Sequence, residues 1–592
     1  MLIRPEDINN TSPLLKRLNS QWLAKSIMWL LGINRLNRAY STLMNSDGQS
    51  LDELLQILDL QYEVTESDLK RIPLKGAFLT VSNHPFGGAD GIILAHLISG
   101  VRPDFKILAN FLLSRIAPLA KYFIPLNPFE EYKNSGMNLT GLRGAFTHLH
   151  DGGPIGLFPA GEVSSIKTRS FRIQDKAWQD TIIRFVKKTA VPVLPIYFDG
   201  FNSKRFYFFG LIHPRLRTIL IPRELFTKSG RKIKIRIGNP IPPSTISEME
   251  SIKDIRLFLR NATYNLRLIY KEKEIFAPLP PHFEEEIIPP ISEIILKKEV
   301  ESLNEHLLFS VKDYDVFCTQ KINIPNIMAE IGRLRETTYR DVGEGTSKKT
   351  DLDRFDEYFH QLFIWDNINY KIVGAYRIGL GREIIAQHGL EGFYINSLFY
   401  IDKSMEPIMT NALELGRSFI VKEYQRKAMP LFMLWKGLFA LLLKHDYRYL
   451  IGPVSISGKF SNVSKALVSE FLKAFYFNQE VAPLIKNRVK TQIKLDKEID
   501  KESFLKATNG DFAKLDKYIQ SIDPSYTTPV LVKQYVSMLN TRAIGFNVDP
   551  EFNNCLDALM MINITEAPKQ FVESLSKDMK DTKLDKLLEE LQ

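Results

Sequence analysis

Gly76–Ser82 reads GAFLTVS, and the chain continues directly into Asn83-His84-Pro85-Phe86-Gly87-Gly88-Ala89-Asp90-Gly91. The apolar run is typical of a buried strand, and the glycine-rich turn after it ends that strand. Similar runs occur at Gly156–Phe158 and Val191–Phe198, and between them Trp178–Lys188 has the spacing of an amphipathic helix. This alternation predicts an α/β domain with its reactive groups beyond the carboxyl ends of the strands.

Two of these strand ends carry candidate chemistry. His84 follows the first strand, and Asp90 stands six positions later. A histidine oriented by a carboxylate can act as a general base that deprotonates a hydroxyl for attack on an acyl carbonyl. The plainer interpretation is that His84 caps a turn and Asp90 starts the next helix. The second strand leads into Phe158-Pro159-Ala160-Gly161-Glu162, a turn that exposes backbone amides.

Taken together, these blocks resemble the glycerolipid acyltransferase superfamily, whose members carry Asn-His-(x)4-Asp and, further along, Phe-Pro-Glu-Gly-Thr-Arg. Phe158 follows His84 by 74 positions, and Val191, Pro192 and Pro195 match a further Val-Pro-x-x-Pro block. The resemblance implies that a His84/Asp90 dyad activates the acceptor hydroxyl toward an acyl thioester of acyl carrier protein or CoA, which is the co-substrate. No metal or organic cofactor is implied. It also implies substrate contacts from five motif residues: Asn83, Phe158, Pro159, Gly161 and Glu162.

The chain departs from the family pattern in two places. Five residues separate His84 from Asp90, as in the hemolysin-labelled subgroup with an NHPxGGxDG form. Ala160 and Val163 stand where the family has Glu and Arg. That Arg is expected to hold an acceptor phosphate by charge-assisted hydrogen bonds, which a valine cannot make. Lys167 or Arg169 could substitute, but the simpler inference is an acceptor without a phosphate there, and Glu162 could favour a cationic headgroup.

The second half of the chain predicts a mixed α/β domain. It has a helical pattern around Leu334-Arg335-Glu336, a strand at Lys371–Ile378 (KIVGAYRI) and a strand-turn at Gly452–Ser457. The plain interpretations are that Arg377 ends an edge strand and that Glu414 and Arg417, at i and i+3, form a surface ion pair.

As an ordered set, the motifs of this half resemble the ornithine-lipid N-acyltransferase family, a branch of the GNAT fold related to acyl-homoserine lactone synthases. The marks are LRxxxY (Leu334–Tyr339), DxDxFD (Asp351–Asp356), the GxYR strand, ELGRS (Glu414–Ser418) and GFNVDPEFNNCLD (Gly545–Asp557). Such enzymes condense an amine with a 3-hydroxyacyl thioester on acyl carrier protein. The resemblance implies that Glu414 orients or deprotonates the amine and that Arg417 binds a carboxylate or the carrier phosphate. Arg377 and Ser455 are further candidates for substrate binding.

The two resemblances together predict one bifunctional enzyme that makes an acylated aminolipid. The C-terminal domain N-acylates an amino acid, ornithine or a similar one, with a 3-hydroxyacyl group, and the N-terminal domain O-acylates the new hydroxyl. An alternative is a lysophospholipid (1-acylglycerol-3-phosphate) acyltransferase with an accessory GNAT domain. The non-enzyme alternative is a membrane-active hemolysin. It is disfavoured because the sequence has no spanning segment, no amphipathic strand repeats and no export signal.

The positive charge of the chain is confined to one half. Residues 1–300 hold 40 Lys+Arg against 29 Asp+Glu, and residues 301–592 hold the remaining 38 against 39. A basic surface suits anionic lipid headgroups, nucleic acid or an acidic carrier protein, or it is only a solvated face. No nucleic-acid recognition motif accompanies it, so we expect acyl carrier protein and a membrane surface as partners, and no nucleic acid.

Membrane contact is expected to be peripheral. No stretch offers the ~20 apolar residues of a spanning helix, and Met429–Leu443, which contains Lys436, is interpreted as a buried core helix. Trp22–Tyr40 has the composition of a helix in a membrane interface or, alternatively, of a helix packed on its own domain. Two cysteines and no signal-peptide pattern predict a cytoplasmic protein, peripheral on the inner face of the cell membrane.

Five segments are expected along the chain. Five prolines between Pro278 and Pro290 mark a linker, because proline disfavours both helix and central strand. The predicted segments are a helical membrane-interface segment at 1–70, the O-acyltransferase domain at 71–275, the Pro-rich linker at 276–300, the GNAT-like domain at 301–575 and a charged tail at 576–592.

Overall fold

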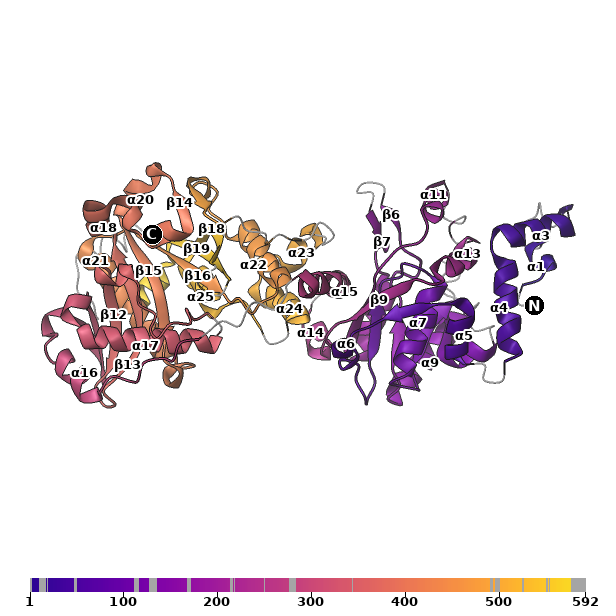
Figure 1. Cartoon of the computed structure of the whole chain (residues 1–592), viewed down its shortest axis with the longest axis horizontal. Helices are drawn as coiled ribbons and strands as arrows, with labels where there is room; N and C mark the ends of the chain where they lie inside the picture. Colours follow the sequence, from indigo (N-terminus) through magenta and orange to yellow (C-terminus); the bar gives the residue numbers. More distant parts are fainter. Residues whose placement is uncertain are drawn as a thin grey trace. The chain divides into compact units, whose positions relative to one another are not determined.

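A computed structural model gives the fold of the chain in two compact units (Figure 1). Unit 1 comprises Met1–Lys273 with Lys497–Ala507 and Gln520–Pro524, and unit 2 comprises the rest. The residues described are 3–9, 17–18, 20–46, 50–110, 117–126, 136–167, 172–212, 217, 219–249, 251–275, 284–342, 344–489, 493, 495, 501–523, 526–549, 552 and 554–576. The first eight residues of the predicted linker (276–283), nearly all of the charged tail (577–592) and Arg169 lie outside them, as does the side chain of Lys167.

Unit 1 is built on a seven-stranded sheet of order β1-β9-β8-β2-β5-β3-β4, in which the β8–β9 pair is antiparallel and the other pairs are parallel. Its strands are β1 (Gln61–Glu63), β2 (Leu79–Ser82), β3 (Lys106–Asn110), β4 (Phe123–Leu126), β5 (Ile155–Leu157), β8 (Val193–Phe198) and β9 (Lys232–Ile237), with a separate pair β6 (Ser165–Lys167) and β7 (Arg172–Gln174). Its helices are α1 (Pro5–Asn9), α3 (Gln21–Leu30), α4 (Ile33–Met44), α5 (Leu51–Leu58), α6 (Glu66–Leu69), α7 (Gly88–Ser99), α9 (Gly136–His150), α10 (Asp180–Thr189), α11 (Lys204–Ile212), α13 (Ile221–Leu225), α14 (Pro243–Ser247) and α15 (Ile252–Ile275).

The three strands expected in unit 1 are confirmed as β2, β5 and β8, and the expected helix is α10. All residues of these strands are buried, which explains why their sequences are continuous apolar runs. The segment before residue 70 is not helical throughout, because it also supplies β1, which pairs with β9 at one edge of the sheet. The β2–α7 turn, with His84, therefore lies at the carboxyl end of a strand with a parallel neighbour on each side.

Trp22–Tyr40 is not one helix. Gly32, at a φ of 72°, separates α3 from α4, and a β-carbon at this position would approach the backbone of Arg223 to 3.0 Å. Glycine meets both demands, since it alone adopts positive φ freely and needs no space for a side chain. Ala24, Met28 and Ile33 pack into a small core at this elbow. The segment thus packs on its own domain and at the same time exposes other apolar residues, described below.

Unit 2 is built on an eight-stranded sheet of order β10-β11-β12-β13-β15-β16-β19-β18. Its strands are β10 (Leu307–Val311), β11 (Tyr314–Gln320), β12 (His360–Asp366), β13 (Lys371–Leu380), β15 (Ala412–Ile420), β16 (Tyr449–Ile456), β18 (Arg542–Asp549) and β19 (Cys555–Asn563), with a separate pair β14 (Phe399–Ile401) and β17 (Ile485–Asn487). The remaining helices are α16 (Glu293–Val300), α17 (Pro325–Val342), α18 (Gly381–His388), α19 (Ile395–Leu398), α20 (Glu406–Thr410), α21 (Ala428–His445), α22 (Asn462–Phe475), α23 (Lys501–Thr508), α24 (Phe512–Ile522), α25 (Val530–Leu539) and α26 (Lys569–Ser576).

The centre of this sheet opens between β15 and β16. These strands form its one parallel pair in the order above, and they are in register only from Ala412 and Tyr449 to Glu414 and Ile451. Both strands continue beyond that point, β15 to Ile420 and β16 to Ile456, without pairing to each other. We call this opening the strand gap. It leaves unpaired backbone at the centre of a sheet, where a ligand can take the place of a neighbouring strand.

Helix α21 is a core helix. Among the described residues it alone has the length and composition to cross a membrane, and 56% of it is buried. Its apolar side chains lie against β11, β12, β13 and α26, and Gly437 lies so close to the sheet that a β-carbon would be 2.8 Å from Leu362. This confirms the interpretation of Met429–Leu443 as buried core.

Candidate active sites

His84 and Asp90 come together at the end of β2. His84 Nδ1 lies 2.9 Å from Asp90 Oδ2, and the same oxygen accepts hydrogen bonds from the backbone N–H groups of Phe86 (2.9 Å) and Gly87 (3.0 Å). Asp90 is fully buried and His84 is partly exposed. Burial raises the pKa of Asp90, and the bonds from His84 and the two amides oppose that shift. Asp90 therefore starts helix α7 and also orients His84, so that its role at the helix start does not exclude the dyad.

The residues around the dyad fix the histidine in place. Asn83 is buried and exchanges two hydrogen bonds with the backbone of Phe198, which ties the end of β2 to β8. The ring of Phe158 lies over His84 with 4.3 Å between centroids. The backbone of His84 donates to Asp175 Oδ1 and accepts from Ser164 N at 2.8 Å. Asn83 and Phe158 therefore support the histidine in different ways. Asn83 holds the end of its strand, and the ring of Phe158 lies directly against the imidazole.

The turn after β5 holds the remaining motif residues. Pro159 accepts a hydrogen bond from the backbone of Gln179, and Gly161 has a φ of 69° that favours glycine. Glu162 is already paired with Arg217 and with Lys176, which argues against its selecting a cationic headgroup. Val163 is buried against Phe206 and Tyr207.

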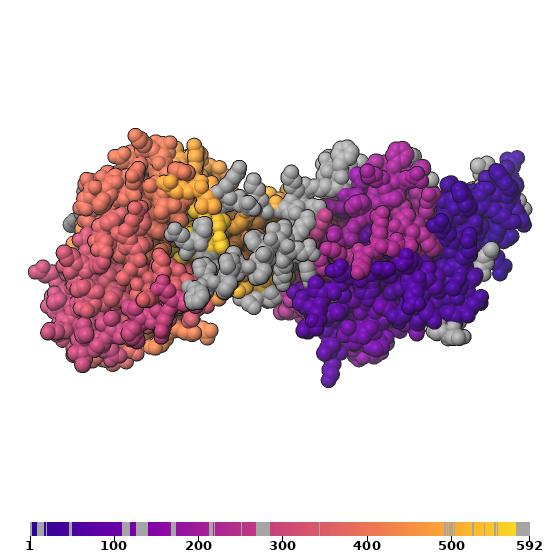
Figure 2. Space-filling view, in the orientation of Figure 1, coloured from indigo at the N-terminus to yellow at the C-terminus, as the bar shows by residue number. Residues whose placement is uncertain are grey.

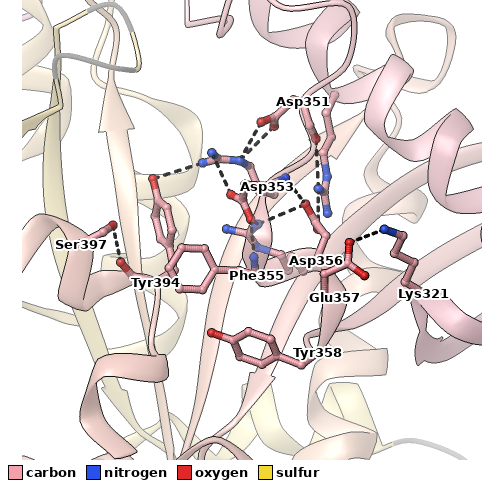
Figure 3. A network of polar contacts seen from close by, with 12 residues as sticks. Lys321, Asp351, Asp353, Phe355, Asp356, Glu357, Tyr358, Tyr394 and Ser397 are labelled. Carbon is pink, nitrogen blue, oxygen red and sulfur yellow. Dashed lines mark hydrogen bonds and ion pairs between the residues drawn. The ribbon is translucent and has the colours of Figure 1, made fainter. Parts of the chain in front are cut away.

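In unit 2, three arginines and three aspartates of the quoted motifs form one network (Figure 3). Arg335 pairs with Asp356 at 2.9 Å, Arg377 with Asp353 at 2.6 Å, and Arg417 with Asp351 at 2.9 Å. Each arginine comes from a different element, α17, β13 or β15, whereas the aspartates share one short segment. The two neighbouring arginines lower the pKa of Asp356 to about 2, although burial opposes this. The DxDxFD motif therefore compensates the buried guanidinium groups that three elements bring together.

Arg377 and Arg417 do not lie at a surface edge. Arg377 is 1% exposed, and its guanidinium lies over the rings of Phe355, Phe359 and Tyr394. Arg417, at a φ of 49°, lies between the rings of Tyr394 and Phe552 and donates to the Tyr394 hydroxyl at 3.3 Å. The edge-strand and surface-ion-pair interpretations are wrong for both residues.

Glu414 does not pair with Arg417. Its carboxylate oxygens accept hydrogen bonds from the backbone N–H groups of Tyr394 (3.0 Å) and Ile395 (2.7 Å), at the start of α19. Burial raises its pKa to about 7. Both oxygens thus hold a neighbouring segment, which leaves the role of Glu414 as the amine base a prediction without direct geometric support.

A second buried carboxylate lies beside the strand gap. Ser455, on β16 beyond the last residue paired to β15, donates from Oγ to Asp557 Oδ1 at 2.7 Å. Asp557 is its register partner on β19 and is 3% exposed. Burial and the nearby Asp549 raise the pKa of Asp557 to about 7, whereas Ser455 and Arg417 oppose the shift. Asp557 lies on β19, one strand beyond the gap, and it is close enough to Arg417 on β15 for their charges to interact.

Several of these residues were missed as site residues, although their motifs were quoted. Asp557 ends the GFNVDPEFNNCLD mark, and Asp353 and Asp356 lie in DxDxFD. Tyr394 and Arg217 belong to none of the motifs, and each joins the site from an element distant in sequence. Among the described residues, no group of three or more His, Cys, Asp and Glu side chains is arranged to hold a metal ion.

The two sites belong to two acyltransferase domains. Residues 15–271 match the family model described as "Acyltransferase", and residues 334–436 match "Acetyltransferase (GNAT) domain". The chain is therefore a bifunctional acyltransferase. It combines an N-terminal acyltransferase domain with a C-terminal GNAT domain, as the sequence predicted.

Relatives with separate functions match this single chain. Glycine N(alpha)-acyltransferase of Phocaeicola vulgatus is 29% identical over 297 residues, which are 48% of this chain and 90% of the relative. Lyso-glycine lipid O-acyltransferase of the same organism is 26% identical over 223 residues, 36% of this chain and 77% of the relative. The crystal structure of the 1-acyl-sn-glycerophosphate acyltransferase PlsC from Thermotoga maritima aligns over 43% of this chain and 94% of its own, with 18% identity and a TM-score of 0.24.

Proposed function

We propose that this chain makes a doubly acylated aminolipid in two steps. The GNAT domain transfers a 3-hydroxyacyl group from a thioester on acyl carrier protein to the amine of an amino acid. The N-terminal domain then transfers a second acyl group to the 3-hydroxyl, and each step releases a thiol. The observation that carries the proposal is the union, in one chain, of domains similar to an N-acyltransferase and to an O-acyltransferase whose name specifies the lyso-lipid. Those names favour glycine over ornithine as the amino acid.

The ester step follows from the geometry of the dyad. Because His84 Nδ1 faces Asp90, Nε2 is the nitrogen available to the acceptor hydroxyl. It takes the hydroxyl proton as the oxygen attacks the thioester carbonyl, and the imidazolium then protonates the leaving thiolate. Asp90 stabilises the imidazolium and holds the tautomer, in the manner of an orienting carboxylate.

For the amide step, we assign the base to Asp557 instead of Glu414. An amine attacks as the neutral species, so a group near the thioester has to accept a proton at neutral pH. Asp557 accepts a hydrogen bond from Ser455, which lies on β16 at the strand gap, and a pKa of about 7 suits that task. Both oxygens of Glu414 are engaged by backbone amides. Arg417, across the gap, remains the candidate for the amino acid carboxylate or the carrier phosphate.

The function is tested by lipid analysis. A bacterial host without aminolipids, made to express the full chain, should accumulate a lipid with one amide-linked and one ester-linked acyl chain. Mass spectrometry of the hydrolysed lipid identifies the amino acid. Accumulation of phosphatidate in place of an aminolipid would instead support a lysophospholipid acyltransferase with an accessory GNAT domain.

An exposed apolar surface on unit 1 supports peripheral attachment to a membrane. It comprises residues from α3 and from α11 with the loop before it: Trp22, Trp29, Leu30, Phe201, Phe208, Phe209 and Leu211. Arg223 links the two parts, because its guanidinium donates to Leu30 O at 3.1 Å and the residue lines a cavity of about 400 Å³ with Phe209 and Lys204. The surfaces of α3–α4 and α11–α13 adjoin in Figure 2. Exposed aromatic residues among cations fit an anionic bilayer interface.

Replacing Trp22 and Trp29 together by serine should lower binding to vesicles that contain phosphatidylglycerol by about tenfold or more, because burying one large apolar side chain contributes ~1.5–3 kcal/mol. Co-sedimentation measures the bound fraction. Deleting the whole segment is a poorer test, since Ala24, Met28 and Ile33 belong to a core. Ile322→Ser, at a residue 82% exposed in unit 2, is the matched control. Equal binding of the two variants would place the anchor elsewhere.

A further inference from the structure

A buried cation lies next to the ester-forming site in a cluster that the mechanism above does not use. Arg217 is 7% exposed, and its Nη2 lies 2.5 Å from Glu162 Oε2. The other oxygen of Glu162 lies 2.7 Å from Lys176 Nζ. One carboxylate is thus shared by two cations, a buried guanidinium and a more exposed ammonium. The three side chains together carry a net positive charge.

Three connections place this cluster beside His84. Glu162 is two residues from Ser164, whose backbone N–H donates to His84 O at 2.8 Å, and two residues span at most about 7 Å. Lys176 follows Asp175, which accepts from the backbone of His84. The Tyr207 hydroxyl lies close enough to Asp90 and Arg217 for both charges to affect its pKa. The cations therefore lie near His84, where they can meet the headgroup of an acceptor whose hydroxyl is at that histidine.

We propose that Arg217 binds the carboxylate of the acceptor lipid and thereby sets the specificity of the ester step. This rests on the proposed function, in which the acceptor is an N-(3-hydroxyacyl) amino acid. Glu162 occupies the guanidinium in the absence of acceptor. When the acceptor carboxylate arrives, Glu162 gives up Arg217 and keeps its bond to Lys176, so that each carboxylate retains one cation. A planar guanidinium pairs well with either carboxylate, so the ion pair that is lost and the ion pair that is gained are of the same kind.

The same cluster disfavours a phosphate headgroup. A phosphate monoester carries more than one negative charge at neutral pH, and Glu162 would remain nearby as a like charge. Val163, next to Glu162 in sequence, is buried against Phe206 and Tyr207 and contributes no cation. Arg217 already pairs with one carboxylate, that of Glu162, so its guanidinium is placed to bind a group of this kind.

The test compares two acceptors on the full-length enzyme, N-(3-hydroxypalmitoyl)glycine and its methyl ester, with the same acyl thioester donor. Lysophosphatidate is offered in a separate arm. The unmodified enzyme should prefer the free carboxylate by about tenfold or more in kcat/KM, the usual size of a lost charge-assisted hydrogen bond. Arg217→Gln should raise KM for the carboxylate and leave the methyl ester nearly unchanged, whereas Arg217→Lys should keep part of the preference. Glu162→Gln should lower KM for the carboxylate, because the resting competitor is weakened.

The control is Arg102→Gln, which removes an equally buried arginine paired with Asp104 at 2.7 Å and should not alter the preference. A purely structural role for Arg217 predicts that Arg217→Gln slows both acceptors alike, and that result would overturn the proposal. Equal use of both acceptors by the unmodified enzyme would also overturn this proposal, but it would leave the proposed function standing. Preference for lysophosphatidate over both would reassign Arg217 to a phosphate, and failure to esterify either acceptor would overturn this proposal and the proposed function together.

Discussion

Cells that express the His84→Ala variant should accumulate the singly acylated amide and lose the doubly acylated lipid. The GNAT domain still forms the amide, but the hydroxyl that it creates has no base to deprotonate it. Loss of a general base typically costs about 10²–10⁴-fold in rate. Lipid extracts resolved by mass spectrometry give the ratio of the two species, and purified enzyme with supplied lyso-lipid gives the rate of the ester step alone.

The chain offers a matched control for this substitution. His96, on α7 of the same domain, also pairs with a carboxylate, since its Nε2 lies 2.9 Å from Asp52 Oδ1. His96→Ala should leave the yield of the doubly acylated lipid nearly unchanged. A normal yield from His84→Ala would show that another group activates the hydroxyl. If both histidine variants lose the ester step together with the fold, the thermal unfolding midpoints will reveal it.

Asp557→Asn should abolish amide formation, again by about 10²–10⁴-fold, because asparagine cannot accept the amine proton. The ester step should survive when the singly acylated amide is supplied. Glu414→Gln should act differently. It leaves one of two backbone amides without its acceptor and so should lower the free energy of unfolding by ~1–3 kcal/mol, with a smaller loss of rate per folded molecule.

The pH dependence tests for a carboxylate base with a pKa near 7, a value that Asp557 and Glu414 share, so the variants of the two residues decide between them. Asp557 acts as a base only when ionised, so the rate of the amide step should fall as the pH drops through about 7. Asp366→Asn, at a buried aspartate that accepts hydrogen bonds from a turn and from the Tyr424 hydroxyl, should keep that profile. The role of base would return to Glu414 if two results were found together. Glu414→Gln would have to lose the amide step at an unchanged unfolding midpoint, and Asp557→Asn would have to stay active.

The contact between His84 and Asp90 could be predicted because its parts are local. Six positions separate His84 from Asp90, and one strand end followed by one helix start brings them to 2.9 Å. The buried strands were predictable for a related reason, since a strand covered on both faces has a continuous apolar sequence. In both cases the relevant neighbours are close in the chain, and the pattern itself contains the geometry.

The rest depended on contacts between distant segments. Arg217 meets Glu162 across 55 positions, and Ser455 meets Asp557 across 102. Glu414 and Arg417 suggested an ion pair at helical spacing, but they lie on a strand in which Arg417 has a positive φ. No periodicity indicates such a conformation for an arginine, which here falls where the pairing of β15 with β13 changes register.

The double duty of Asp90 affects how related sequences should be interpreted. Its carboxylate closes the start of α7 through two backbone amides, so its loss would loosen the domain even in a protein that has ceased to transfer acyl groups. Selection for folding alone would then preserve this aspartate in inactive descendants. Selection for folding does not preserve His84 in the same way. Among the contacts described, its partly exposed ring caps no helix or turn. In a degenerate copy, the histidine should be replaced first, and it is the residue whose presence marks a working domain.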